Sequence, residues 1–337
     1  MKKKLWVLLA GLIVCLSLSA CGTKSQEDVV KDLSGKMEKI KSYEATAKMT
    51  LKMGTDPQTY VVQVWHKEPT YYRVSLKNAQ KDQSQMILRN DEGVYVLTPA
   101  LNKSFKFQSD WPENSSQAYL YESLIKDIVA DKEAKFSSTD KYYIFETKTR
   151  YQNNKMLPFQ EVTLNKKDLS PATVKVMDTD GNALVTVKFS DVKFDKNFTK
   201  KDFDMKKNMT GAQLEVPVMG DVEDKAFSVK YPTEEFKDVK LVEEKEVSTE
   251  NGKRVILTYD GALSYTLMEE KAEVVPATAG PTIVKGEPVD LGFTVGALSK
   301  NTLTWTFQGV DYMLASQDLK KEEMASVARS VQGDVSK

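Results

Sequence analysis

The sequence has 337 residues, of which 41% are hydrophobic and 28% are charged, and its 48 basic side chains are balanced by 48 acidic ones. This balance excludes the strongly basic composition of a typical nucleic-acid binder, and the length suffices for two domains of ordinary size. The two cysteines, Cys15 and Cys21, both lie near the N-terminus. A disulfide framework is therefore excluded, and the rest of the chain must be held together by its hydrophobic core.

Residues 1–20 have the pattern of a signal peptide of the lipoprotein type. Lys2 to Lys4 form a basic region, an apolar run extends from Leu5 to Leu18, and small residues precede Cys21. In this lipobox pattern the signal is cleaved before the cysteine, after a diacylglycerol has been attached to the thiol. We therefore expect a lipidated Cys21, anchored to the extracytoplasmic face of the cell membrane, with residues 21–28 as a tether. The alternative is an uncleaved membrane-spanning helix, for which about 17 apolar residues are marginal.

A helix followed by a series of strands is predicted after the tether. Apolar residues recur every three or four positions from Val29 to Ile40, which indicates one buried face of a helix over residues 25–41. From Tyr43 to Met53 apolar and polar residues alternate, which indicates a strand with one buried face. Similar strands with short connections, typical of an antiparallel meander, are predicted at 59–66, 70–77, 84–90, 94–98 and 104–108.

A second helix is predicted over residues 115–130, where the apolar residues from Tyr121 to Ile128 share one face and Ser115 or Ser116 is the expected N-cap. The segment Asp178–Gly181 is interpreted as a hairpin turn rather than a calcium loop, because the other ligands of an EF-hand loop are absent. The sheet resumes with strands at 142–149, 160–165, 172–177 and 184–194, so that residues 25–205 form one domain.

A smaller second domain is predicted at 227–337, after residues 206–226, which lack a period and are interpreted as a linker or an edge extension. The segment 275–288 is rich in proline and glycine and indicates a loop or an irregular strand pair. A C-terminal helix is expected at 320–331. Strands at 240–248, 253–259, 263–269, 290–298, 302–307 and 310–315 complete a small antiparallel sheet in an α+β arrangement.

Catalytic motifs are absent from the sequence. His66 is the only histidine, so a Ser-His-Asp triad would need it and a two-histidine metal site is excluded. Its place at the end of a predicted strand indicates a solvated histidine rather than a catalytic one. Paired carboxylates of a hydrolase are left open, since two acidic residues facing one substrate leave no trace in a sequence. We expect a protein that is not an enzyme, with no cofactor and no metal.

The first domain pairs about ten strands with two helices, which are too few to cover one apolar face completely. Leftover concave apolar surface is typical of a hydrophobic-ligand cavity. The alternative is that the same side chains pack beneath the helices as ordinary core. The candidates to line the cavity are Met49, Leu51, Val62, Val64, Val74 and Leu76.

Residues 25–205, with a helix leading into alternating strands and a closing segment Asp202–Met205, resemble the LolA/LolB/LppX type of lipoprotein carrier. The whole chain, including Thr304-Trp305 and the segment Gly309–Ser316, is similar to the YdcC sporulation lipoproteins of endospore-forming bacteria. The resemblance implies a mainly β fold, in which a half-open antiparallel β-barrel with a helical lid precedes the small C-terminal domain. It also implies membership of the sporulation or germination machinery.

These observations together predict a membrane-anchored, non-catalytic lipoprotein of the envelope. Its half-barrel is expected to bind a lipid, an acyl chain or a hydrophobic partner segment. The alternative is a filled barrel that serves as a scaffold or regulator for a cell-wall or germination enzyme. The expected partners are the membrane, through Cys21, and such a ligand or an envelope protein, but no nucleic acid. Strand-exchanged dimers are left open.

Overall fold

A computed structural model describes residues 24–53, 57–79, 84–109, 111–112, 116–151, 156–215, 228–249, 252–276 and 280–331. The predicted signal peptide, the lipidation site Cys21 and the candidate N-cap Ser115 lie outside these residues. In the described part of the chain, no helix is both long enough and apolar enough to span a membrane.

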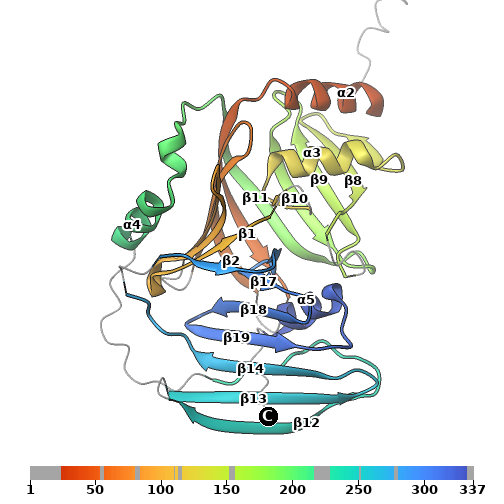
Figure 1. The fold of residues 1–337 in the computed structure, drawn as a ribbon. Coiled ribbons are helices and arrows are strands. Elements are labelled where there is room, and N and C mark those ends of the chain that lie inside the picture. The colour runs from red at the N-terminus through yellow and green to blue at the C-terminus, as the bar shows by residue number, and fades with distance from the viewer. Residues whose placement is uncertain are drawn as a thin grey trace, which may run out of the picture.

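Two open sheets dominate the structure (Figure 1). In the described residues the larger sheet has 12 strands in the order β15-β6-β5-β4-β3-β2-β1-β11-β10-β9-β8-β7. Its end strands do not pair with each other, so the sheet curves without closing. The strands are β1 (Ser42–Leu51), β2 (Gln58–Lys67), β3 (Tyr71–Asn78), β4 (Ser84–Asn90), β5 (Gly93–Thr98), β6 (Lys103–Phe107), β7 (Lys135–Ser138), β8 (Tyr142–Lys148), β9 (Phe159–Asn165), β10 (Pro171–Met177), β11 (Ala183–Phe194) and β15 (Thr282–Val284).

Two helices lie on the inner side of this sheet, α2 (Gln26–Met37) and α3 (Tyr121–Ala130). The N-terminus of α2 is closed by a capping box between Ser25 and Asp28. Helix α3 touches both halves of the curved sheet, because Tyr121 packs against Tyr43 of β1 and the backbone carbonyl of Asp127 accepts a hydrogen bond from Thr147 of β8. The mainly β fold and the half-open barrel with helices on its inner side are thereby confirmed.

The smaller sheet is antiparallel and has seven strands in the described residues. Helix α5 (Lys321–Ser330) packs on one of its faces and also reaches the first domain, where Ser326 contacts Met156 (Figure 1). One hydrophobic core continues from the larger sheet into this one. In spatial order the strands are β12 (Val239–Thr249), β13 (Gly252–Gly261), β14 (Tyr265–Lys271), β19 (Val310–Ala315), β18 (Thr302–Phe307), β17 (Val295–Leu298) and β16 (Glu287–Asp290).

The outer side of the larger sheet has its own apolar cluster, covered by a 3₁₀ turn at Lys200–Phe203 and by α4 (Met205–Glu215). Phe203 is fully buried there and Met209 is 8% exposed. The segment from residue 206, predicted to be a linker or an edge extension, therefore begins as a helix. Its apolar residues are few and interrupted by Gly211, so the sequence carries only a weak helical pattern.

Three further elements differ from the predictions. The short strand β7 was not predicted. Strand β15 pairs in parallel with β6, a partner more than 170 residues earlier in the chain. The predicted strand 290–298 is split into β16 and β17 by a turn at Gly292, whose φ of +85° favours glycine.

Candidate functional site

The six residues predicted to line a cavity lie on the inner face of β1, β2 and β3, as their alternation implies. Each is at most 2% exposed, and all six belong to the continuous core that also contains α2, α3 and parts of the smaller sheet. Their role in binding a ligand stays a prediction, because burial in this structure is equally the property of ordinary core. The residues are Met49, Leu51, Val62, Val64, Val74 and Leu76.

The β16–β17 hairpin of the second domain reaches this inner face. Its turn residues Leu291 and Phe293 are 0% and 3% exposed, and Gly292 lies against Leu51 and Met53. A Cβ atom on Gly292 would come within 3.0 Å of Met53 Cε, so the approach depends on glycine. The second domain thus fills the end of the half-barrel with its own apolar side chains.

A pocket of about 320 Å³ lies beside this hairpin, between the edge of the larger sheet and the smaller sheet. Strands β5, β6, β17, β18 and β19 supply most of its walls. Aromatic and methionine side chains are prominent in the lining, a composition suited to an apolar ligand of adaptable shape. These side chains are Phe105, Phe107, Trp305, Tyr312, Met268 and Met313.

Polar groups lie at defined points of the pocket. Lys103 Nζ is 2.6 Å from Asp311 Oδ2, and the lysine side chain is 11% exposed. Thr306 donates a hydrogen bond to the other oxygen of Asp311. Gln85 Oε1 accepts hydrogen bonds from the backbone N–H of Val295 and from the Thr294 hydroxyl, at 3.0 and 3.1 Å. The pocket therefore combines apolar walls with one mostly buried cation, Lys103, whose ammonium group is paired with Asp311.

His66 is buried rather than solvated, which corrects the prediction made from its position at a strand end. It is 4% exposed, its Nδ1 is 3.1 Å from the Tyr71 carbonyl, and its Nε2 is 3.2 Å from Glu122 of α3. The two ring nitrogens therefore face oxygen atoms of two different elements, the Tyr71 carbonyl of β3 and the Glu122 carboxylate of α3. The Tyr43 hydroxyl also donates to Glu122, at 2.9 Å. The pair ties α3 to β2, a contact with no local signal in the sequence.

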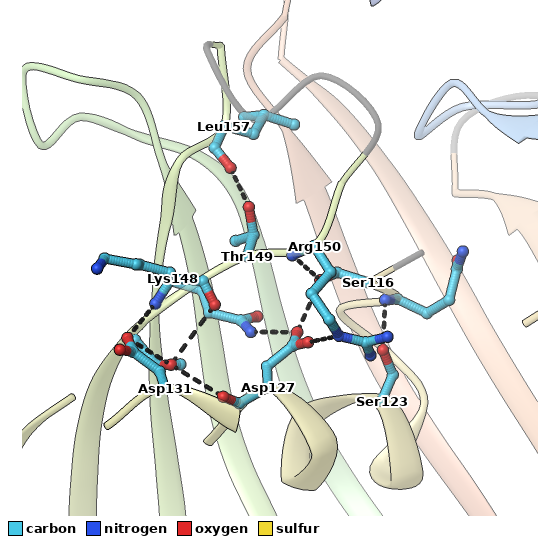
Figure 2. Close-up of polar contacts among 11 residues, drawn as sticks. Ser116, Ser123, Asp127, Asp131, Lys148, Thr149, Arg150 and Leu157 are labelled. Atoms are coloured by element: carbon cyan, nitrogen blue, oxygen red, sulfur yellow. Dashed lines mark hydrogen bonds and ion pairs between the residues drawn. The ribbon is translucent and has the colours of Figure 1, made fainter. Parts of the chain in front are cut away.

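A second buried polar cluster holds α3 against the sheet. Figure 2 shows Asp127 accepting hydrogen bonds from Ser116 and Arg150, and Gln160 Nε2 lies 2.7 Å from the same carboxylate. Burial raises the pKa of the Asp127 carboxyl, and the hydrogen bond from Ser116 opposes this effect. Ser116, proposed as a helix cap, instead donates to the Asp127 carboxylate within α3, and the N-cap position of α3 is Leu120.

A third buried polar group joins the smaller sheet to the elements of the larger one. The Asp290 carboxylate accepts hydrogen bonds from the Tyr119 hydroxyl at 3.1 Å and from the backbone N–H of Gly292 at 2.7 Å. Arg329 of α5 donates to the Asp290 backbone carbonyl at 2.6 Å. Burial raises the pKa of Asp290. These bonds fix the hairpin that fills the end of the half-barrel.

In the part of the chain that the structure describes, no group of three or more His, Cys, Asp or Glu side chains could hold a metal ion. The sequence did not predict this pocket, because its walls come from segments about 200 residues apart and no local pattern links such segments.

The chain has clear relatives. A family model for YdcC-like sporulation proteins matches residues 1–203. Sporulation protein YdcC of Bacillus subtilis strain 168 is 56% identical over 336 residues, which cover 100% of this chain and 99% of that protein. The Pseudomonas aeruginosa MucA/MucB complex aligns at 11% identity and a TM-score of 0.32, over 90% of this chain and 100% of that chain. A LolA superfamily protein of Nitrosomonas europaea aligns at 15% identity and a TM-score of 0.29, over 52% of this chain and 97% of that chain.

Proposed function

Because the chain belongs to the family of YdcC-like sporulation proteins, we propose that it is a non-catalytic binding protein, anchored outside the cytoplasm by a lipidated Cys21. Its ligand in this proposal is a hydrophobic chain, taken up in the pocket between the two sheets.

The anchor is supported by the lipobox that ends at Cys21. Replacement of Cys21 by alanine is expected to move the protein from the membrane fraction to the soluble fraction or the medium. Fractionation with immunoblotting measures this directly. Continued sedimentation of Cys21→Ala with membranes would contradict the anchor and would indicate another attachment.

The ligand site is supported by the size and lining of the pocket. A cavity of about 150 Å³ is large enough to hold benzene. The pocket of about 320 Å³ is twice as large and therefore has room for a segment of an acyl chain or for a few apolar side chains. The half-barrel interior is a weaker candidate in this conformation, since Leu291 and Phe293 already occupy its end.

Lys103 gives the pocket a preferred ligand polarity. Its ammonium group is mostly buried and is paired with Asp311, which is 36% exposed at the side chain. A ligand with a carboxylate or phosphate head could take the place of Asp311 next to Lys103 while its apolar chain lies against Trp305 and Tyr312. The single observation that carries the proposal is this pairing of one buried cation with an apolar-aromatic wall.

The experiment is titration of the chain from residue 22 onward with a fluorescent fatty acid. Ala297 lines the pocket, so Ala297→Trp is expected to abolish binding by filling it. Ala262 is exposed in the loop that joins β13 to β14 of the smaller sheet. Ala262→Trp is therefore the matched control, with the same increase in side-chain size. Equal binding by the two variants, or no binding by the unmodified protein, would contradict the pocket as the ligand site.

The second candidate function is a scaffold for another envelope protein. It is favoured by the full burial of the six inner-face residues, which is the state expected of a filled barrel. Native mass spectrometry of protein purified from sporulating cells separates the two. Co-purifying acyl species support the ligand proposal, whereas a ligand-free protein that crosslinks to one defined partner supports the scaffold.

A further inference from the structure

Three lysines on the outer side of the larger sheet lie in one row across four strands. The ladder pairs Lys77 of β3 with Val61 of β2, Val61 with Lys48 of β1, and Lys48 with Lys188 of β11. Residues directly opposite in an antiparallel ladder share a face. Along each strand these lysines adjoin buried core residues, so the row points away from the core; the core residues are Ala47, Met49, Leu76 and Val187. All three lysine side chains are exposed.

The three lysines have no counter-charge. None of them makes an ion pair or a hydrogen bond through its side chain in the part of the chain that the structure describes. Two other lysines on the same side of the sheet are paired, Lys175 with Glu161 at 2.8 Å and Lys193 with Asp191 at 2.6 Å. The row therefore stands out from its surroundings as a line of unneutralised positive charge.

The pairing of Lys48 with Lys188 disfavours the fold. Like charges directly opposite on neighbouring strands destabilise a sheet. Threonine occupies the equivalent places one row further along, where Thr50 of β1 faces Thr186 of β11. A threonine pair at these two positions would remove the repulsion, and threonine has a higher preference for strands than lysine. The stability of the sheet therefore does not explain why two lysines face each other here. A bound anion would neutralise it.

Hydroxyl groups surround the lysines. Thr173 of β10 is the next member of the row after Lys188, and Thr163 of β9 follows it. Thr50 and Thr186 lie in the adjacent row. The outer face thus offers ammonium and hydroxyl donors in adjacent rows across the strands. Such donors suit a ligand that consists mainly of negatively charged acceptor oxygens.

The geometry favours a chain-like ligand over a folded partner. Neighbouring strands are about 4.8 Å apart, so the row from Lys77 to Lys188 spans about 14 Å in a straight line. Protein interfaces are depleted in lysine and enriched in aromatic residues, whereas the only apolar residue between the lysines is Val61, which is 42% exposed. Single-stranded nucleic acids need exposed rings for base stacking, and the row contains none.

We propose that this row, Lys77, Lys48 and Lys188, is a binding surface for a linear polyanion that carries repeated phosphate groups. The polymer lies across the strands, its phosphates contact the ammonium groups, and the flanking threonine hydroxyls donate to phosphate oxygens. The surface lies on the opposite side of the sheet from the main core and is independent of the pocket proposed above.

The test is binding of inorganic polyphosphate to the chain from residue 22 onward, measured over a series of salt concentrations. For single-stranded polyanions the slope of log K against log salt is about −0.7 for each charge neutralised. Three lysines therefore predict a slope of about −2. The variant Lys48→Gln, Lys77→Gln, Lys188→Gln is expected to bind at least tenfold more weakly at low salt, with a slope near zero.

The matched control removes three exposed lysines from the second domain, as Lys237→Gln, Lys240→Gln, Lys245→Gln. It changes the net charge equally and is expected to keep the affinity and slope of the unmodified protein. Both variants should unfold at or above the normal temperature, since the first also removes the Lys48–Lys188 repulsion. Equal weakening by the two variants, or absence of polyphosphate binding, overturns the proposal. Tighter, lysine-dependent binding of polyglutamate or of anionic phospholipid vesicles than of polyphosphate also overturns it, in favour of that class of partner.

Discussion

Glu269 makes the stability of the second domain depend on pH. It lies in the centre of the smaller sheet, is 0% exposed, and accepts hydrogen bonds from the Lys230 backbone N–H at 3.2 and 3.0 Å. Burial raises the pKa of Glu269 to about 7, from 4.5 for an unperturbed glutamate. The folded state therefore holds its proton over a pH range in which the unfolded state has released it.

The sign and size of the effect follow from linkage. The stabilisation from the bound proton is complete below pH 4.5 and is lost as the pH rises to about 7. Each pKa unit corresponds to about 1.4 kcal/mol, so a shift of about 2.5 units predicts a loss of roughly 3 kcal/mol across this range. Glutamine has a similar shape and does not ionise. Glu269→Gln is therefore expected to lack this part of the pH dependence.

Urea unfolding of the unmodified protein and of Glu269→Gln, at intervals between pH 4.5 and 7.5, measures the effect as a difference. Other buried carboxyls, including Asp127, contribute equally to both proteins and cancel. The free energy of unfolding of the variant, relative to the unmodified protein, should rise with pH by roughly 3 kcal/mol. A difference that stays constant with pH would refute the reasoning, because Glu269 would then ionise as easily in the folded state as in the unfolded one.

Two further substitutions test the buried contacts. Asp127→Asn removes the charge that accepts hydrogen bonds from Ser116 and Arg150, and should destabilise the protein by about 2 kcal/mol in thermal or urea unfolding. Asp140→Asn, on an exposed turn, is its control and should change nothing measurable; an equal effect would contradict the role of the cluster. Phe293→Ala should cost about 3 kcal/mol, since the ring is 3% exposed. Phe159→Ala, at a ring 44% exposed, should cost less than about 1 kcal/mol, and similar losses would show that the hairpin does not fill the half-barrel.

Local patterns were sufficient to predict most of the strands. The alternation in β1 placed Met49 and Leu51 on the buried face, and the structure keeps that alternation from Tyr43 to Leu51. Helix α3 was predicted from its apolar face, although its first residue is Tyr121 rather than a residue near Ser116. These elements are predictable because period and burial are set by side chains within a few residues of one another.

The features that the sequence did not predict depend on contacts with residues far away in the chain. His66 is polar and ends a strand, but Glu122 and the Tyr71 carbonyl, brought together by the fold, allow its burial. Helix α4 has little apolar character of its own and is held by a cluster on strands β3 to β5. The filling of the half-barrel by Phe293 also depends on a distant partner, because no sequence pattern near Leu51 indicates a contact with a hairpin some 240 residues later.

The parallel pairing of β15 with β6 has a consequence for the order in which the protein can mature. Strand β6 is complete when residue 107 has been made, but its free edge is covered only by residues 282–284. Bonds between Leu101 and Val275 and between Asn102 and Val275 continue the same seam. During synthesis, the β6 edge of the larger sheet therefore stays open and can pair with other strands until nearly the whole chain has been made. A chain that ends before β15 is expected to keep that edge exposed, so this short strand also protects the larger sheet against aggregation.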